Sequence, residues 1–295
     1  MRVLNFGSLN LDYVYRVGHF VQPGETLSAA SQKVLPGGKG LNQSVALARA
    51  GVRVFHAGCL GSGGEMLAEL LRKSGADIRF LRCVDELQGN AVIQVDDAGQ
   101  NCILLFGGSN RCVTKEQAEA TLSSFSSGDY LVLQNEINAL PLIVDKAYAR
   151  GMKIVLNPSP CDEQLQAVDF GKLDWLLVNE VEAEQLTGSG QPEEAWKVLH
   201  VRYPALNLVV TLGSAGSAAF TAKETVRQEA FPVRVLDTTA AGDTVTGYFT
   251  AGLMEGRSLR ECMRRAAMAA AISVTREGAA PSIPVRAEVE QALSS

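Results

Sequence analysis

The amino-acid sequence predicts an α/β protein with a mainly parallel sheet covered by helices, and a small β-sheet lid beside it. Short apolar, β-rich runs alternate with helical patterns along most of the 295 residues, as in sheets covered on both faces. Helices often have a proline near the start and a glycine just past the end. The segment from Pro141 to Gly151 shows both features. Two stretches, residues 13–34 and 90–106, lack helical periodicity and break the alternation. These observations predict the fold class.

Each element follows from its local pattern. The first half predicts, in order, the strand Arg2–Gly7, the helix Leu41–Ala50, the strand Arg53–Cys59, the helix Met66–Lys73 and the strand Tyr130–Gln134. The second half predicts a helix from about Pro141 to Arg150, strands at Lys153–Leu156, Trp175–Val178, Leu206–Thr211, Ala218–Phe220 and Phe231–Leu236, and helices at about Gly242–Met254 and Ser258–Thr275.

The two interrupting stretches predict a small antiparallel sheet. The second reads as a hairpin, AVIQV and NCILLF joined by Asp-Asp-Ala-Gly. Ligands of open α/β proteins bind at the carboxyl ends of the strands, so a β-flap there is expected to act as a lid. The expected division is an α/β core of residues 1–11, 36–88 and 108–295, with a lid of residues 12–35 and 89–107.

Composition excludes several classes of function. The net charge of −5 argues against a broad nucleic-acid or anionic-membrane surface, which needs a basic face. The N-terminus lacks the apolar core of a signal peptide, and no apolar run is long enough to span a membrane. Six scattered cysteines without a C-x-x-C pair are typical of free thiols. We therefore expect a cytoplasmic protein without a nucleic-acid or membrane partner.

The strongest motif is DTTAAGDT, at the start of the helix expected from Gly242. Small residues leave the first N–H groups of this helix uncovered, and such a terminus attracts anions. Asp243, one residue into the helix, is placed to accept a proton from an attacking hydroxyl while the amides stabilise a transferring phosphoryl group. The alternative is a first-turn acid favoured only by the helix dipole.

Two further segments suit a polyhydroxy ligand. PGGKGLN is a glycine turn entering a helix, where a ligand can touch the backbone and Asn42 can both donate and accept hydrogen bonds. Asn10 and Asp12 follow the first strand, and one carboxylate can accept from two adjacent hydroxyls. A plain helix-entry turn and turn-forming Asn and Asp are the alternatives.

Two more segments suit a nucleotide and a metal. Asn179 and Glu182 share a helical face and offer the oxygen ligands that hydrated magnesium prefers. N-capping by Asn179 is the alternative. The turn from Thr211 to Gly216 can cradle phosphates through backbone N–H groups, although an isolated Gly-x-x-Gly is weak evidence.

Five segments, taken together and in this order, resemble the ribokinase family of sugar kinases (PfkB-type). They are GSLNLD, GGKGLNQ, NEVEAEQLTG, TLGSAG and DTTAAGDT, and the resemblance extends from Arg2 to about Pro284. The resemblance implies a ribokinase-like three-layer core with a β-lid that also forms a dimer contact. It implies ATP-dependent phosphorylation of a primary hydroxyl, with magnesium and an activating monovalent cation such as potassium.

The resemblance also implies roles for individual residues. Asp243 would be the base, with the N–H groups of Ala241, Gly242 and Asp243 as the anion hole. The sugar would be held by Asn10, Asp12, Gly38, Lys39, Gly40, Asn42 and Glu136. ATP would contact Asn179, Thr211, Gly213, Ser214, Gly216 and Gly242, while Asn179 and Glu182 would hold magnesium through water. The monovalent cation would lie at Asp237, Thr239, Ser273, Arg276, Gly278 and Ser282, mostly on backbone carbonyls.

Within the family, the spacing of Asn10, Asp12 and GGKG-x-N looks most like the members that phosphorylate the 5-hydroxyl of D-ribose. Leu41, Val245, Thr246 and Thr239 depart from the residues usual at their positions. Leu41 adjoins the sugar loop, so another sugar or nucleoside (fructose, deoxyribose or adenosine) stays open as the acceptor. A non-catalytic sugar-binding protein is the remaining alternative.

Overall fold

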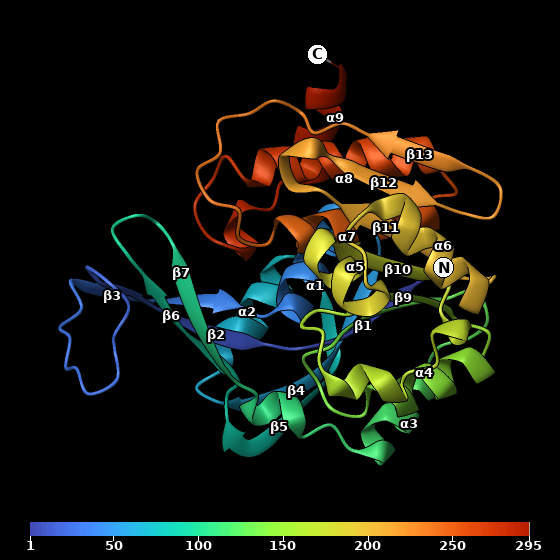
Figure 1. Cartoon of the computed structure of the whole chain (residues 1–295). Helices are drawn as coiled ribbons and strands as arrows, with labels where there is room; N and C mark the ends of the chain where they lie inside the picture. The colour runs from blue at the N-terminus through green and yellow to red at the C-terminus, as the bar shows by residue number, and fades with distance from the viewer. Residues whose placement is uncertain (295) are drawn as a thin grey trace.

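The structure, a computed structural model that describes residues 1–294, is organised around a nine-stranded sheet. Its strand order is β13-β12-β11-β10-β9-β8-β1-β4-β5 (Figure 1). All the pairings are parallel except those of β11 with β12 and β12 with β13 at one edge. The strands are β1 (Val3–Phe6), β4 (Val54–Ser62), β5 (Asp77–Leu87), β8 (Tyr130–Gln134), β9 (Lys153–Asn157), β10 (Trp175–Asn179), β11 (Asn207–Thr211), β12 (Ser217–Phe220) and β13 (Thr225–Gln228).

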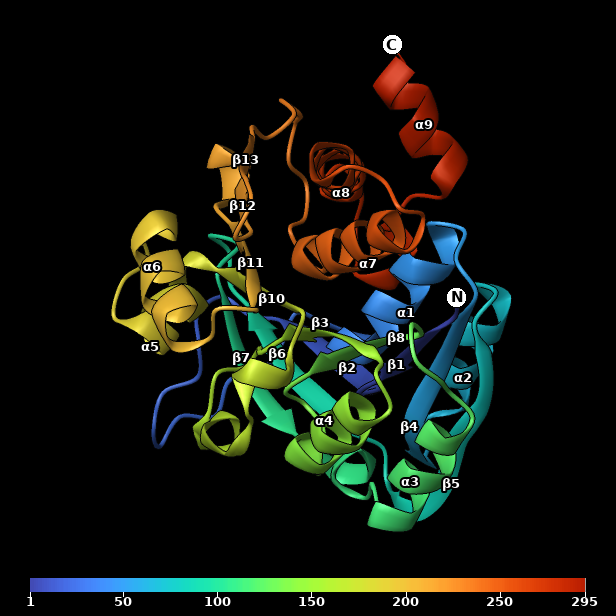
Figure 2. The same cartoon turned by 90° about the vertical axis from the view of Figure 1, so that its right-hand side faces the viewer.

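Helices cover both faces of this sheet (Figure 2), because the strands are apolar on both sides. One face packs against α3 (Lys115–Ser123), α4 (Leu140–Ala149), α5 (Glu180–Thr187) and α6 (Pro192–Arg202). The other packs against α1 (Lys39–Arg49), α2 (Glu65–Lys73), α7 (Ala241–Met254), α8 (Leu259–Ser273) and α9 (Arg286–Ser294). Successive side chains of a strand point to opposite faces, so Leu4 lies in the first layer and Val3 in the second. The predicted three-layer α/β fold is confirmed.

A second sheet of four strands projects from one side of the core (Figure 1), in the order β3-β2-β6-β7. Its strands are β2 (Asn10–Arg16), β3 (Ser31–Gly37), β6 (Asn90–Val95) and β7 (Asn101–Phe106). Within each of the two chain segments the strands pair antiparallel, as expected, and the two segments meet through a parallel pairing of β2 with β6. The whole of β7 is exposed.

The expectation of a strand at Phe231–Leu236 is wrong. This segment is irregular and mostly exposed, and Pro232 lacks the N–H that a strand-to-strand hydrogen bond requires. Conversely, β5 was missed because its sequence, DIRFLRCVDEL, carries charges where a central strand is apolar. Such charges are normal on an edge strand, and β5 lies at the edge of the sheet. The helices α3 and α6 were missed as well.

Two expectations about the chain as a whole were tested. Among residues 1–294 no helix combines the length and apolarity needed to cross a bilayer. All six cysteines are free, as predicted, although Cys83 and Cys102 are exposed rather than buried in the core.

Candidate functional site

The N-terminus of α7 lies at the centre of the candidate site. Ala240, which precedes the helix, has a left-handed conformation with φ 62°, and no side chain caps the helix. This conformation is rare for residues other than glycine and occurs often at functional sites. The N–H of Ala241 donates to the Thr238 carbonyl at 3.2 Å, whereas no acceptor in residues 1–294 faces the N–H groups of Gly242 and Asp243. These two groups therefore form an anion-binding end of the helix.

The Asp243 carboxylate, only 5% exposed, is held by two side-chain amides of α1. The Asn42 Nδ2 donates to Asp243 Oδ2 at 3.0 Å, and the Gln43 Nε2 donates to Asp243 Oδ1 at 2.9 Å. Both oxygens are thus oriented by helix α1, which begins at the glycine turn. The predicted residues Asn42 and Asp243 lie together, although they are separated by about 200 residues in sequence.

Two glycines allow the turn before α1 to approach β1. Gly38 has a φ of 92°, a conformation that glycine adopts without strain. A Cβ atom on Gly40 would stand only 2.3 Å from the Ser8 backbone nitrogen, so no larger residue fits there. Gly38, Lys39 and Gly40 consequently lie against the segment that leads from β1 to Asn10, which brings two predicted sugar-binding segments together.

Two further carboxylates of the predicted sugar-binding set, Asp12 and Glu136, lie near Asp243. Burial, followed by the charges of Glu136 and Asp243, raises the pKa of Asp12 to about 7. Burial also raises the pKa of Glu136, whose Oε2 accepts hydrogen bonds from the Ser8 hydroxyl and from the Lys39 backbone N–H. Burial alone would lower the pKa of the Lys39 ammonium, but Asp243, Glu136 and Glu182 raise it. Lys39 is therefore a permanent cation among carboxylates.

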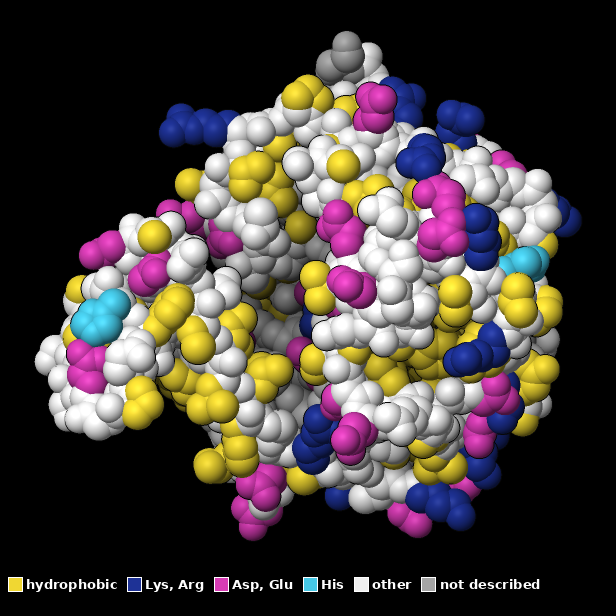
Figure 3. Space-filling model, viewed as in Figure 1, with side chains coloured by type: hydrophobic (Ala, Val, Ile, Leu, Met, Phe, Trp, Pro, Cys, Tyr) yellow, Lys and Arg dark blue, Asp and Glu magenta, His cyan; other side chains and the backbone are white. Residues whose placement is uncertain are grey.

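Asn10, the remaining predicted sugar residue, is oriented by Asn110, which the sequence analysis missed. The Asn110 Nδ2 donates to Asn10 Oδ1 at 2.7 Å, so the Asn10 amide NH2 is left for a ligand. A small cavity of about 90 Å³ lies here between the core and the second sheet, lined by Asn10, Leu105, Phe106, Gly107, Asn110, Arg111, Asn135, Glu136 and Pro160. Figure 3 shows the deep hollow between the projecting sheet and the core.

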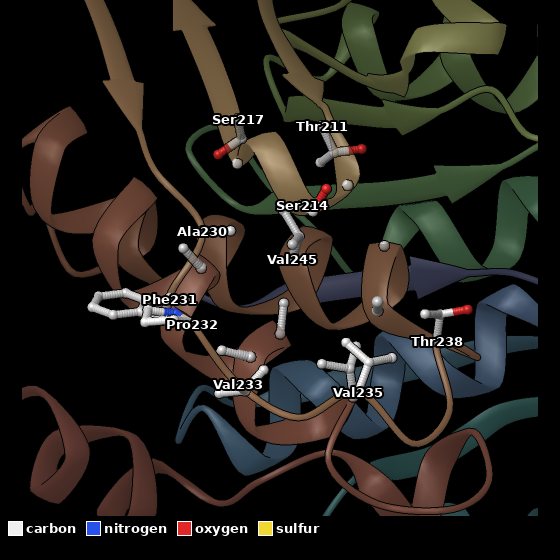
Figure 4. Close-up of a pocket in the computed structure, with 18 residues that line it drawn as sticks. Thr211, Ser214, Ser217, Ala230, Phe231, Pro232, Val233, Val235, Thr238 and Val245 are labelled. Carbon is white, nitrogen blue, oxygen red and sulfur yellow. The ribbon is translucent and has the colours of Figure 1, made fainter.

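A larger cavity of about 530 Å³ lies on the other side of the α7 N-terminus. Five of the residues predicted to contact ATP line it, namely Thr211, Gly213, Ser214, Gly216 and Gly242. Figure 4 shows Phe231, Pro232, Val233 and Val235 along one wall and Thr211, Ser214 and Ser217 along another. The irregular segment 231–236 thus serves as a cavity wall. A cavity of this size, mostly apolar with a few polar groups, is typical of small-molecule sites.

Asn179 and Glu182 form the capping box at the start of α5. The Asn179 Oδ1 accepts the Glu182 backbone N–H at 2.8 Å, and the Glu182 Oε2 accepts the Asn179 N–H at 3.0 Å. The N-capping alternative for Asn179 is therefore correct, and Asn179 does not line the larger cavity. No cluster of three or more His, Cys, Asp or Glu that could hold a metal occurs in residues 1–294.

The residues predicted for a monovalent cation belong to two adjoining segments. The Asp237 carboxylate accepts hydrogen bonds from Thr239 and, at 2.9 Å, from the Gly278 N–H, which ties the segments together. Burial alone would raise the pKa of Asp237, but these hydrogen bonds lower it. Arg276 donates to the Ser282 carbonyl at 3.4 Å, and the Ser273 hydroxyl bonds to Ala270 in its own helix.

Sequence reasoning also missed the polar side chains beneath α1. Four polar residues lie in mostly apolar strands and point to the face covered by α1 and α7, namely Asn5, His56, Gln134 and Asn157. A polar residue inside an apolar buried strand is the signal that would have found them. Gln43, which follows the predicted sugar-binding residue Asn42, is fully buried among these side chains.

Comparisons with known proteins agree with this geometry. The profile described as pfkB family carbohydrate kinase matches residues 2–286. The ribokinase of Haemophilus influenzae is 36% identical over 301 residues, covering 97% of this chain and 96% of that one. The structure of Arabidopsis thaliana ribokinase complexed with ribose and ATP superposes with a TM-score of 0.88, 30% identity and coverage of 100% and 99% of the two chains. Ribokinase from Cryptococcus neoformans in complex with ADP gives a TM-score of 0.87 at 34% identity, covering 99% of each chain. The chain belongs to the pfkB family of carbohydrate kinases, which are phosphotransferases with an alcohol group as acceptor.

Proposed function

We propose that this protein transfers the γ-phosphoryl group of ATP to the 5-hydroxyl of D-ribose. The observation that carries the proposal is the position of Asp243, which lies between a polar cavity edge at Asn10 and Glu136 and a mostly apolar cavity beyond Gly242. The similarity to ribokinases with bound ribose, ATP or ADP supports ribose as acceptor and ATP as donor. Fructose, deoxyribose and adenosine are the alternative acceptors.

In this mechanism the Asp243 carboxylate accepts the proton of the sugar 5-hydroxyl. The oxygen then forms its bond to the γ-phosphorus as the bond from that phosphorus to the β-phosphate oxygen breaks, releasing ADP. The N–H groups of Gly242 and Asp243, with a smaller share from Ala241, face the transferring oxygens, and the Lys39 ammonium offsets their charge. Most of the rate acceleration comes from positioning and electrostatics.

The sugar is held by Asn10, Asp12, Asn42, Glu136 and the glycine turn Gly38–Gly40. Asp12 and Glu136 each offer carboxylate oxygens to adjacent hydroxyls, and Asn10 offers its free amide NH2. Residues 12–35 and 89–107 act as a lid on the core of residues 1–11, 36–88 and 108–295. Closure over the sugar would exclude water from the transferring group.

The residues present fit magnesium and a monovalent cation. Magnesium is usually held by one or two carboxylates, water and substrate phosphates, and the buried Glu182 supplies one such carboxylate near Lys39. Magnesium would neutralise charge on the phosphates. Potassium would be held by carbonyls of the two segments joined by Asp237, namely those of Asp237, Thr239, Ser273, Arg276, Gly278 and Ser282.

The proposal includes a homodimer and a cytoplasmic location. The exposed β7, with Leu104 71% and Ile103 52% exposed, is an open sheet edge suited to pairing with a second copy of the chain. A homodimer through the lid follows. We place the protein in the cytoplasm, where its six free thiols stay reduced.

A coupled assay of ADP release tests the function. Ribose, deoxyribose, fructose and adenosine are compared as acceptors, each with and without potassium. We expect the highest kcat/KM with ribose and stimulation by potassium. A higher kcat/KM with another acceptor would identify that compound, rather than ribose, as the substrate. No ADP release with any acceptor would favour a sugar-binding protein without catalysis.

A further inference from the structure

A line of buried side-chain amides leads from the glycine turn to Asp243. The Asn5 Nδ2 donates to the Gly40 carbonyl and to the Ser44 hydroxyl, both at 2.7 Å. The Gln134 Nε2 donates to Asn5 Oδ1 at 2.8 Å and to Gln43 Oε1 at 2.6 Å. The Gln43 Nε2 then donates to Asp243 Oδ1 at 2.9 Å. Three amides thus connect a backbone carbonyl to the carboxylate.

The two ends of this line determine the orientation of every amide in it. The Gly40 carbonyl can only accept a hydrogen bond, so Asn5 must turn its NH2 group there and its oxygen toward Gln134. Gln134 must then present its NH2 group, which leaves the oxygen of Gln43 facing Gln134. The NH2 group of Gln43 is consequently directed at Asp243.

We propose that Gln43 is a positioning residue for Asp243, kept in its donor orientation by Gln134 and Asn5. The inference rests on the proposed role of Asp243 as the base. An amide directed at Oδ1, together with Asn42 at Oδ2, fixes the plane of the carboxylate. Fixed donors in a buried site act without reorganisation during the reaction.

Gln43 differs from its neighbour Asn42 in what it touches. Gln43 is fully buried, and both hydrogens of its NH2 group are used, one by Asp243 and one by Asn157 Oδ1 at 3.3 Å. In contrast, Asn42 is 5% exposed and is one of the residues proposed to hold the sugar, and its buried Oδ1 has no partner in residues 1–294. Gln43 therefore acts on the base alone, and its loss is expected to change turnover rather than sugar affinity.

His56, which joins this line of amides through the Ser44 hydroxyl, contributes no charge. His56 bonds to the Ser44 hydroxyl at 2.8 Å through Nδ1 and is fully buried, and burial lowers its pKa to about 3. His56 is consequently neutral at physiological pH. Asp243 is therefore the acidic group toward which this line of amides is directed.

The test compares Gln43→Met with the wild-type protein under saturating ATP. Methionine keeps the length of glutamine and removes the donor. We expect kcat to fall about 10- to 100-fold, the usual effect of losing a hydrogen bond to a charged group, while the KM for ribose stays within about 2-fold.

Gln117→Met is the matched control. Gln117 is a half-buried glutamine whose Nε2 donates at 2.7 Å, but to the Gly58 carbonyl, away from Asp243. This variant should leave kcat unchanged. Gln43→Glu provides a second variant of nearly the same shape, in case the methionine variant does not fold. It replaces the donor by a carboxylate beside Asp243, so it should also lower kcat.

Three results would overturn the inference: folded Gln43 variants with wild-type kcat, a rise in KM at unchanged kcat, or an equal loss of kcat in Gln117→Met. The Asp243→Asn variant distinguishes a failure of this inference from a failure of the proposed function. If Asp243→Asn is inactive while the Gln43 variants behave as wild type, the positioning role fails and the base stands. If Asp243→Asn turns over normally, the proposed base itself fails.

Discussion

Gly247 of α7 lies directly against Ala46 of α1, so close that a Cβ atom on Gly247 would stand 2.4 Å from the Ala46 Cβ. Gly247 is one helical turn after Asp243, and Ala46 is one turn after Asn42 and Gln43. The missing side chain therefore permits the helix separation at which both amides reach the carboxylate.

Gly247→Ala is expected to separate the two helices. It should destabilise the protein by about 1–3 kcal/mol, as overpacking of a core does, and lower kcat because the amides move away from Asp243. Thermal unfolding and ribose-dependent ADP release measure the two effects. Adding Ala46→Gly removes the opposing methyl group and should restore part of both. A double variant no better than Gly247→Ala would argue against this contact as the cause.

Asp243→Asn is expected to lower kcat by about 10²- to 10⁴-fold, the range for loss of a general base, without unfolding the protein. Steady-state kinetics at saturating ribose and ATP measure the effect. Asp145→Asn, which removes an exposed carboxylate paired with Lys172, is the control and should keep wild-type kcat. Near-normal turnover by Asp243→Asn would remove Asp243 from the proposed role.

Sugar affinity is expected to depend on pH through Asp12. Because the pKa of Asp12 is raised to about 7, chiefly by burial, much of this group is protonated below neutral pH. The charged form accepts hydrogen bonds from hydroxyls, so the KM for ribose should fall as the pH rises through about 7. Asp12→Asn should weaken ribose binding and flatten this dependence. If the variant keeps an inflection of the same size, another group is responsible.

Ala267→Leu is expected to weaken nucleotide binding. Ala267 of α8 lines the larger cavity, and a leucine there would occupy space that the adenine base needs. We expect the KM for ATP to rise about 10-fold, equivalent to about 1.4 kcal/mol, with little change in the KM for ribose. Initial-rate kinetics with each substrate varied separately distinguish the two constants. A selective rise in the KM for ribose would instead place the sugar in this cavity.

Leu104→Glu is expected to disrupt the homodimer proposed at β7. Leu104 is 71% exposed in the free chain, and a buried charge at a subunit contact is costly. Light scattering after size-exclusion chromatography should show a dimer for the wild type and a monomer for the variant. Val201→Glu, at a residue 85% exposed on α6, is the matched control and should remain dimeric. A monomeric wild type would reject the proposed assembly.

Local sequence patterns were enough to predict the α/β class and the segments that form the candidate site. Glycine turns and helix starts are local features, so GGKG and DTTAAGD could be identified from a few neighbouring residues. The resemblance of five ordered segments then indicated the family, which the comparisons confirm. Local patterning failed at Phe231–Leu236, where residues with strand propensity find no partner strand, and at β5, where an edge position tolerates charges.

The residues that contact one another in the site could be identified only from the folded chain. Gln43, Gln134 and Asn5 come from a helix and two strands, and nothing in their local sequence shows that their amides meet. Asn110 likewise reaches Asn10 from about 100 residues away. Hydrogen-bond partners and pKa values depend on burial and on distances between segments, which arise only when the strands align in the sheet and α1 packs against α7.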